Sequence, residues 1–174
     1  MRLSFSSDHV SDVVFTDDQN RQVYATTSSM LVRRTEILKF GPGTANPSNL
    51  ALVHFHNWSP DTITLRGQEL AAKEYLVKPS WLSSRRVFTT ADGTTFEWQE
   101  DGLTTWRVSL LNGPEVGRSH SRSLGLLSDR HPPYLEFSDD PHVLNSLDEL
   151  VATFVYLRIR QVKQRRRRNA AVNT

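Results

Sequence analysis

The stretch Ser146–Ile159, which reads SLDELVATFVYLRI, decides the fold. Ser146 followed three residues later by Glu149 is the pattern of a capping box. In that motif the serine side chain accepts a hydrogen bond from a helical amide, and the glutamate reaches back. Asp148 adds a negative charge near the positive end of the helix dipole. The sequence therefore predicts a helix over residues 146–168.

This predicted helix is apolar on almost every side along Leu150–Leu157. A helix of that kind is normally surrounded by protein. The run has eight residues, whereas a bilayer needs about 20. We therefore expect the rest of the chain to enclose the helix.

The residues before the helix read as short strands separated by turn signals such as Gly41-Pro42-Gly43, Arg66-Gly67 and Ala91-Asp92-Gly93. Asp-Gly readily supplies the positive φ angles of a tight primed hairpin turn. About ten to twelve strands are expected. They cover Val13–Thr16, Gln22–Thr27, Leu31–Phe40, Leu50–Trp58, Thr62–Leu65, Arg86–Thr90, Thr94–Trp98, Leu103–Leu110, Glu115–Arg122 and Tyr134–Phe137.

Many short strands and one apolar helix predict a mainly β fold. We expect a closed antiparallel barrel of about 12 strands around a central C-terminal helix, because closure removes exposed sheet edges. The alternative is a helix on one face of a β-sandwich. The length suits a single domain over residues 1–168, followed by a short disordered tail over residues 169–174.

Three segments together resemble a fungal family of small domains of unknown function, which is grouped by fold with the tubby C-terminal, LURP-one-related and phospholipid-scramblase proteins. The segments are Arg85–Trp98, Glu115–Arg122 and Leu147–Arg168. The resemblance implies the tubby-like barrel around a helix, and no established activity. Among the fold relatives, tubby domains bind phosphoinositide headgroups and scramblases act at membranes.

The composition excludes several classes of site. Without cysteine the chain cannot form disulfides, thiolate nucleophiles or cysteine-ligated metal centres. The net charge of +2 conceals an asymmetry, because seven basic residues fall within Arg158–Arg168 and the rest of the chain carries −5. The N-terminus lacks the apolar stretch of a secretory signal. We expect an intracellular protein, cytoplasmic or nuclear, with no transmembrane segment.

The polybasic tail is the first candidate site, with Lys163, Arg165, Arg166, Arg167 and Arg168. Such a cluster serves as a nuclear import signal, as an anchor for anionic lipid or as a nucleic-acid contact. It is also typical of a solvated helix end, where cations favour the negative end of the dipole. The sequence leaves these four readings open.

The second candidate is a phosphate clamp formed by Arg118, His120 and Arg122, which alternate along one strand and so share one face. Guanidinium groups bind phosphate in two-point geometry. Arg85 or Arg86, on the preceding hairpin, would complete the clamp if the fold brought it close. The competing reading is a polar outer face paired with surplus acids.

No metal, cofactor or catalytic group is expected. His54 and His56 share a strand face, but the sequence fixes no third ligand near them. Motifs for a nucleophilic serine, a phosphate-cradling glycine loop and a zinc protease are absent from the sequence. Trp58, Trp81, Trp98 and Trp106 would form a stacking platform only if they were exposed together.

These features favour a non-catalytic binding module over an enzyme. The expected partner is an anionic phospholipid headgroup or another protein. One alternative is a nuclear or nucleic-acid-associated factor directed by the arginine-rich C-terminus. The other is a carbohydrate-binding defence protein.

Overall fold

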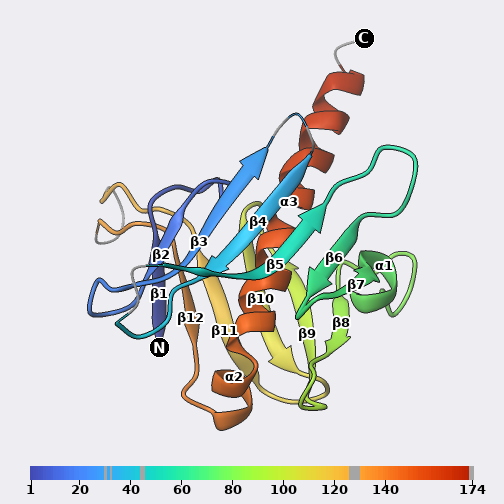
Figure 1. The fold of residues 1–174 in the computed structure, drawn as a ribbon. Coiled ribbons are helices and arrows are strands. Elements are labelled where there is room, and N and C mark those ends of the chain that lie inside the picture. Colours follow the sequence, from blue (N-terminus) through green and yellow to red (C-terminus); the bar gives the residue numbers. More distant parts are fainter. Residues whose placement is uncertain (30, 32, 44–45, 126–129, 173–174) are drawn as a thin grey trace.

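The computed structural model describes residues 1–29, 31, 33–43, 46–125 and 130–172. Within them, twelve strands and three helices form one mainly β fold (Figure 1). The strands are β1 (Arg2–Phe5), β2 (Val14–Thr16), β3 (Gln22–Ser29), β4 (Arg34–Lys39), β5 (Ser48–His54), β6 (Thr62–Leu65), β7 (Gln68–Ala71), β8 (Arg86–Thr89), β9 (Thr95–Asp101), β10 (Thr105–Leu110), β11 (Glu115–His120) and β12 (Tyr134–Phe137). The helices are α1 (Ala72–Tyr75), α2 (Pro141–Asn145) and α3 (Leu147–Val172).

All twelve strands belong to one antiparallel sheet, in the order β7-β6-β5-β4-β3-β2-β1-β12-β11-β10-β9-β8. The predicted closed barrel is not supported, because no hydrogen-bonded ladder joins the edge strands β7 and β8. Helix α1 and the loop after it stand between these strands, and a single bridge joins Val77 to Val87. The segment that connects β7 to β8 thus lies between the two edges, and β7 and β8 do not pair directly.

Helix α3 passes between the two halves of this curved sheet (Figure 1). Every residue from Leu150 to Leu157 is buried. The ring of Phe154 lies 6.2 Å from Phe5 on β1 and 5.9 Å from Trp98 on β9. The expectation of an enclosed apolar helix is confirmed, since strands from distant parts of the sheet pack on it.

The start of α3 differs from the predicted capping box. The hydroxyl of Ser146 hydrogen-bonds to Thr90 and Asp92 instead of a helical amide. The Glu149 carboxylate accepts from the amide of Ala91 and pairs with Arg66 at 3.1 Å. Tertiary partners from two hairpins replaced the local motif, because the helix begins inside the protein.

Helix α2 and the C-terminal end of α3 were also not predicted. Asp140 caps α2 by accepting a hydrogen bond from the amide of His142 at 2.8 Å. Four residues of the predicted tail, 169–172, continue α3. Alanines at 170 and 171 favour helix, and no glycine or proline interrupts it. Residues 173–174 lie outside the described residues.

The alternating strand directions divide the loops between two ends of the sheet. Loops after the odd-numbered strands lie where α3 leaves the sheet, and we call this the exit end. Loops after the even-numbered strands lie at the opposite end, beside the start of α3. No helix in the described parts of the chain is long and apolar enough to cross a membrane.

Candidate functional site

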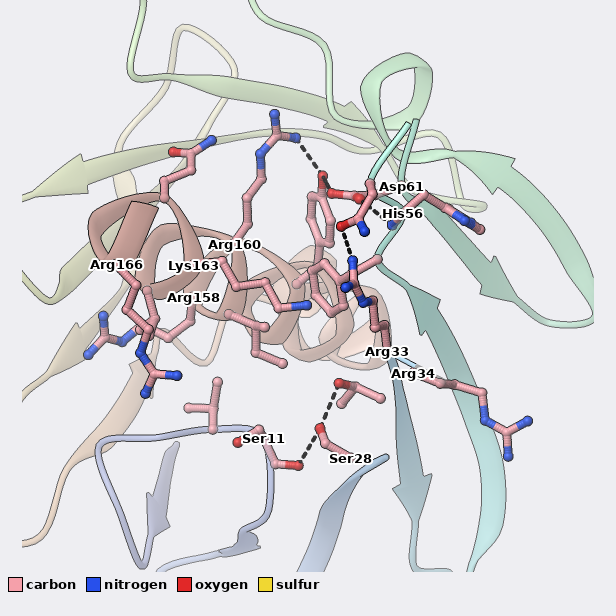
Figure 2. A pocket seen from close by; sticks show the side chains of 18 of the residues that line it. Ser11, Ser28, Arg33, Arg34, His56, Asp61, Arg158, Arg160, Lys163 and Arg166 are labelled. Carbon is pink, nitrogen blue, oxygen red and sulfur yellow. Dashed lines mark hydrogen bonds between the residues drawn. The ribbon is translucent and has the colours of Figure 1, made fainter. Parts of the chain in front are cut away.

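A cleft of about 770 Å³ opens at the exit end, beside α3. The loops after β1, β3 and β5 form one wall, and α3 forms the other (Figure 2). We call it the exit cleft. Its charged lining residues are Asp12, Arg33, Arg34, Asp61, Lys73, Arg158, Arg160, Lys163, Arg166 and Arg167.

The exit cleft is strongly cationic. Its described lining has eight arginines and lysines against two aspartates, a net charge of +6 when the histidines are neutral. Among the described residues, Arg34 is the one cleft cation with a carboxylate within 4.0 Å, that of Glu36. The remaining cations therefore keep most of their attraction for an external anion.

Stacked rings hold the centre of the cleft wall. The ammonium group of Lys163 lies 3.6 Å from the centre of the Phe55 ring, and Phe55 stacks on Tyr156 at 5.8 Å. Tyr156 donates to Asp61 at 3.2 Å and accepts from Arg160 at 2.5 Å. Burial raises the pKa of Tyr156 to about 12, so its hydroxyl stays protonated. These contacts with Phe55 and Tyr156 hold Lys163 and Arg160 over the cleft.

Arg158 lies deepest among the cleft cations, with 6% of the residue exposed. It donates to the side chain of Gln161 at 2.7 Å and to the carbonyl of Asp8 at 3.5 Å. Burial, followed by the neighbouring charge of Arg165, lowers the pKa of Arg158. A sheltered guanidinium without a carboxylate partner among the described residues is costly, and a bound anion would relieve that cost.

Arg33 supplies a cation from the opposite wall. It adopts φ +50°, an uncommon backbone conformation for a residue other than glycine. Its guanidinium donates to the side chain of Asn57, and its carbonyl accepts from the amide of Phe55 at 3.0 Å. These bonds tie the loop after β3 to the loop after β5, and they place Arg33 across the cleft from α3 (Figure 2).

A family model described as "Family of unknown function (DUF6593)" matches residues 8–166. This span contains the sheet from β2 onward, the buried part of α3 and nearly all of the exit cleft. The chain belongs to DUF6593. No curated protein and no solved structure matches it.

In this DUF6593 domain, the predicted polybasic tail is the end of a continuous helix. Lys163, Arg166 and Arg167 line the exit cleft. Arg165 instead pairs with Glu100 on β9 at 3.2 Å, and Arg168 is exposed. The cluster is thus divided between two faces of α3, and only part of it serves the cleft.

The predicted clamp residues Arg118, His120 and Arg122 do line one hollow of the domain, with a volume of about 510 Å³. Arg118 donates to Glu115 at 2.9 Å and lies 3.5 Å from Asp101. Arg122 donates to the carbonyl of Ser6 at 2.8 Å. Arg118 is thus neutralised by two carboxylates, whereas Arg122 bonds a neutral carbonyl and is a single cation without a carboxylate within 4.0 Å among the described residues.

His120 stacks on Tyr134 at 4.2 Å, and its Nε2 lies 3.3 Å from a Glu136 carboxylate oxygen without hydrogen-bond geometry. Burial lowers the pKa of His120, although the Glu136 charge opposes this. The imidazole is therefore neutral at physiological pH and adds no charge to the second hollow.

Arg85 and Arg86 are not brought to that hollow, because β9 and β10 separate β8 from β11. Arg85 pairs with Glu97 at 3.4 Å. Burial lowers the pKa of Arg86, and the nearby charge of Arg160 adds to the effect. Arg86 lies opposite Trp98 in the sheet register, on the face that packs on α3, and the predicted five-residue clamp does not form.

The remaining candidates give no further site. His54 and His56 lie 6.0 Å apart, and no group of three potential ligands occurs among the described residues. Trp98 and Trp106 are buried, whereas Trp58 and Trp81 are exposed. A stacking platform of four tryptophans is thus excluded.

Sequence reasoning missed Arg33, Lys73, Arg158 and Arg160 as site residues. Arg33, Lys73 and the pair on α3 are far apart in the chain, and only the strand directions bring these three segments to one end of the sheet. The one available signal was the place of a residue in the strand order. In an up-and-down sheet, residues that follow odd-numbered strands lie at the same end, and Arg33 and Lys73 both do so.

Proposed function

We propose that this DUF6593 domain is a non-catalytic binding module whose exit cleft takes phosphate-bearing anions, above all the headgroups of anionic phospholipids. The observation that carries the proposal is the cleft's net charge of +6, held by cations of which only Arg34 has a carboxylate partner among the described residues. Guanidinium and ammonium groups are the usual protein ligands of phosphate.

The arrangement of the cations also supports a phosphate ligand. Arg33 reaches the cleft from one wall, and Arg158, Lys163 and Arg166 reach it from α3 (Figure 2). A phosphate group has several acceptor oxygens and can accept hydrogen bonds from opposite sides. The helix end adds long-range attraction through Arg167 and Arg168.

The proposal also covers the location, the fold family and the source of the protein. An intracellular location would place the cleft beside the anionic lipids of the cytoplasmic leaflet. We also propose a tubby-like fold and a fungal source. The single antiparallel sheet around a C-terminal helix supports the first, and the sequence resemblance supports both.

Vesicle co-sedimentation tests the proposal. The intact chain should bind vesicles of phosphatidylcholine with phosphatidylserine or a phosphoinositide, and should not bind phosphatidylcholine alone. Binding should weaken steeply as salt is added. Absence of binding to every anionic vesicle at low salt would remove the lipid function.

Two paired variants locate the site. Lys163→Gln with Arg166→Gln removes two cleft charges, and at about 1 kcal/mol each this costs about thirtyfold in vesicle affinity. Arg118→Gln with Arg122→Gln removes the same charge from the second hollow and should change affinity little. Equal losses in both pairs would show general charge attraction without a cleft site.

A second candidate function is nuclear import through the end of α3. Arg166, Arg167 and Arg168 are exposed, and none has a carboxylate within 4.0 Å among the residues described. Replacing the three by glutamine in the intact chain leaves the buried part of the helix unchanged. Loss of nuclear accumulation would support this function, and an unchanged distribution would contradict it.

A further inference from the structure

Among the described residues, the large apolar side chains most exposed to solvent lie at the exit end. Each is at least 72% exposed and lies in a loop after an odd-numbered strand: Leu31 after β3, Trp58 after β5, Trp81 and Leu82 after β7 and α1, Leu103 after β9, and Leu124 after β11. At the opposite end, the most exposed large apolar side chains that the structure describes, Leu111 and Leu144, reach 43%. The two ends of the sheet therefore differ in apolar exposure.

Leu31 and Trp58 stand directly beside the exit cleft. Trp58 is fully exposed, and its neighbours Asn57 and Ser59 line the cleft. Leu31, 96% exposed, lies two residues before Arg33. The hydrogen bonds between Arg33 and the loop after β5 hold these two loops together. Two apolar tips thus flank the strongest concentration of cations.

Single exposed apolar residues are common on soluble proteins. Here, however, they are spread over five separate loops at the cationic end of the molecule. A protein interface usually presents a contiguous, contoured patch. Separate apolar side chains beside cations suit a lipid bilayer, which has an anionic surface and an apolar interior. Tryptophan also prefers the interface of a bilayer.

We propose that the exit end docks on an anionic membrane surface, with Trp58 and Leu31 entering the interfacial layer while the exit cleft holds a phospholipid headgroup. This inference rests on the proposed function and adds the insertion of Leu31 and Trp58 into the membrane beside the bound headgroup. Leu31 and Arg33 lie in one loop, and this loop is hydrogen-bonded to the loop that carries Trp58. Headgroup binding and insertion therefore occur together.

Helix α3 limits how the protein can lie on the membrane. It continues past the strands at the exit end (Figure 1), and it carries exposed Arg166–Arg168, which cannot enter hydrocarbon. Docking must therefore be tilted toward the cleft side. Leu103 lies next to β9, beside the helix face where Arg165 pairs with Glu100, and it should remain outside the bilayer.

Tryptophan fluorescence tests insertion directly. In the Trp81→Phe variant, Trp58 is the one exposed tryptophan, because Trp98 and Trp106 are buried. Vesicles of phosphatidylcholine and phosphatidylserine with brominated acyl chains should quench its emission. Vesicle binding without bromine quenching would overturn insertion and leave headgroup binding intact.

Affinity variants supply the second readout. Leu31→Ser with Trp58→Ser should weaken binding to these vesicles by about tenfold or more, since interfacial anchoring is lost. Binding of soluble inositol hexakisphosphate, measured by calorimetry, should not change. Leu103→Ser is the matched control and should bind vesicles like the unaltered chain.

The two proposals fail in different ways. If the chain binds inositol hexakisphosphate but no vesicle, or if Leu31→Ser with Trp58→Ser binds vesicles normally, membrane docking is wrong and the cleft site stands. If neither the soluble phosphate nor the vesicles bind, the proposed function itself is wrong.

Discussion

The indole nitrogen of Trp98 on β9 donates a hydrogen bond of 2.9 Å to the hydroxyl of Thr153 in the second turn of α3. Both residues are buried. Thr153 in turn donates to the carbonyl of Glu149 at 2.8 Å. This polar link fixes the helix against one strand within an otherwise apolar core.

Replacing Thr153 by valine should lower the free energy of unfolding by about 2 kcal/mol, because the indole N–H of Trp98 loses its partner in the core. Valine has nearly the same shape, so packing changes little. Urea denaturation followed by circular dichroism measures the loss. Thr27→Val, at an exposed position of β3, is the control and should stay within about 0.5 kcal/mol. Equal effects at both sites would contradict the role assigned to the hydrogen bond.

Gly117 on β11 leaves no room for a side chain. A Cβ there would lie 2.5 Å from the Phe137 ring and 2.8 Å from the carbonyl oxygen of Glu136. Gly117→Ala should therefore cost about 2 kcal/mol or more of unfolding free energy, again measured in urea. Adding Phe137→Leu should recover only part, because the backbone carbonyl still obstructs the methyl group. A wild-type stability for Gly117→Ala would show that β12 can move away.

His120 makes stability depend on pH. Burial lowers its pKa below the usual value of 6.5 in the folded protein. The unfolded chain therefore takes up the proton first, and the free energy of unfolding should fall as pH decreases from about 6.5 through the folded pKa. His120→Phe keeps the ring stack on Tyr134 and should flatten this part of the pH profile.

The His120 titration can be followed by NMR in the folded protein and in urea. The folded midpoint should be the lower of the two. A higher folded midpoint would mean that the Glu136 carboxylate outweighs burial, and the pH dependence would then reverse.

Asp61 is one of two acids in the exit cleft, so its removal should strengthen anion binding. Asp61→Asn keeps an oxygen that can accept from the amide of His56, now 3.0 Å from the carboxylate. Affinity for anionic vesicles should rise about threefold at low salt and return to the original value at high salt. Asp139→Asn makes the same charge change at the opposite end, where the side chain is 84% exposed, and should have little effect. Weaker binding by Asp61→Asn would argue against a phosphate ligand in the cleft.

The sequence predicted the central helix and most strands, because apolar content and turn residues are local signals. β1 and β7 were missed; β7 reads Gln-Glu-Leu-Ala and so lacks the β-branched and aromatic residues that mark a strand. Helix α2 was not predicted, although Asp140 followed by Pro141 suits the first turn of a helix.

The candidate site was harder to predict than the fold. Arginines at 118 and 122 show strand spacing, yet their acceptors come from the loop after β1 and from Glu115 and Asp101, which spacing does not reveal. The exit cleft combines Arg33 with Arg158, and only the order and direction of the strands bring them together. Sheet closure was equally beyond local patterns, because it depends on whether β7 and β8 meet.

The position of α3 after all the strands has a consequence for biosynthesis. A ribosome completes every strand of the sheet before it makes the helix that fills its interior. Until then, side chains such as Phe15, Ile37 and Val53 have no partner to cover them, although each is fully buried in the finished protein. The nascent chain thus passes through an interval in which its exposed apolar surface favours aggregation. A stop codon shortly before Leu147 would prolong that interval indefinitely and direct the product to proteolysis.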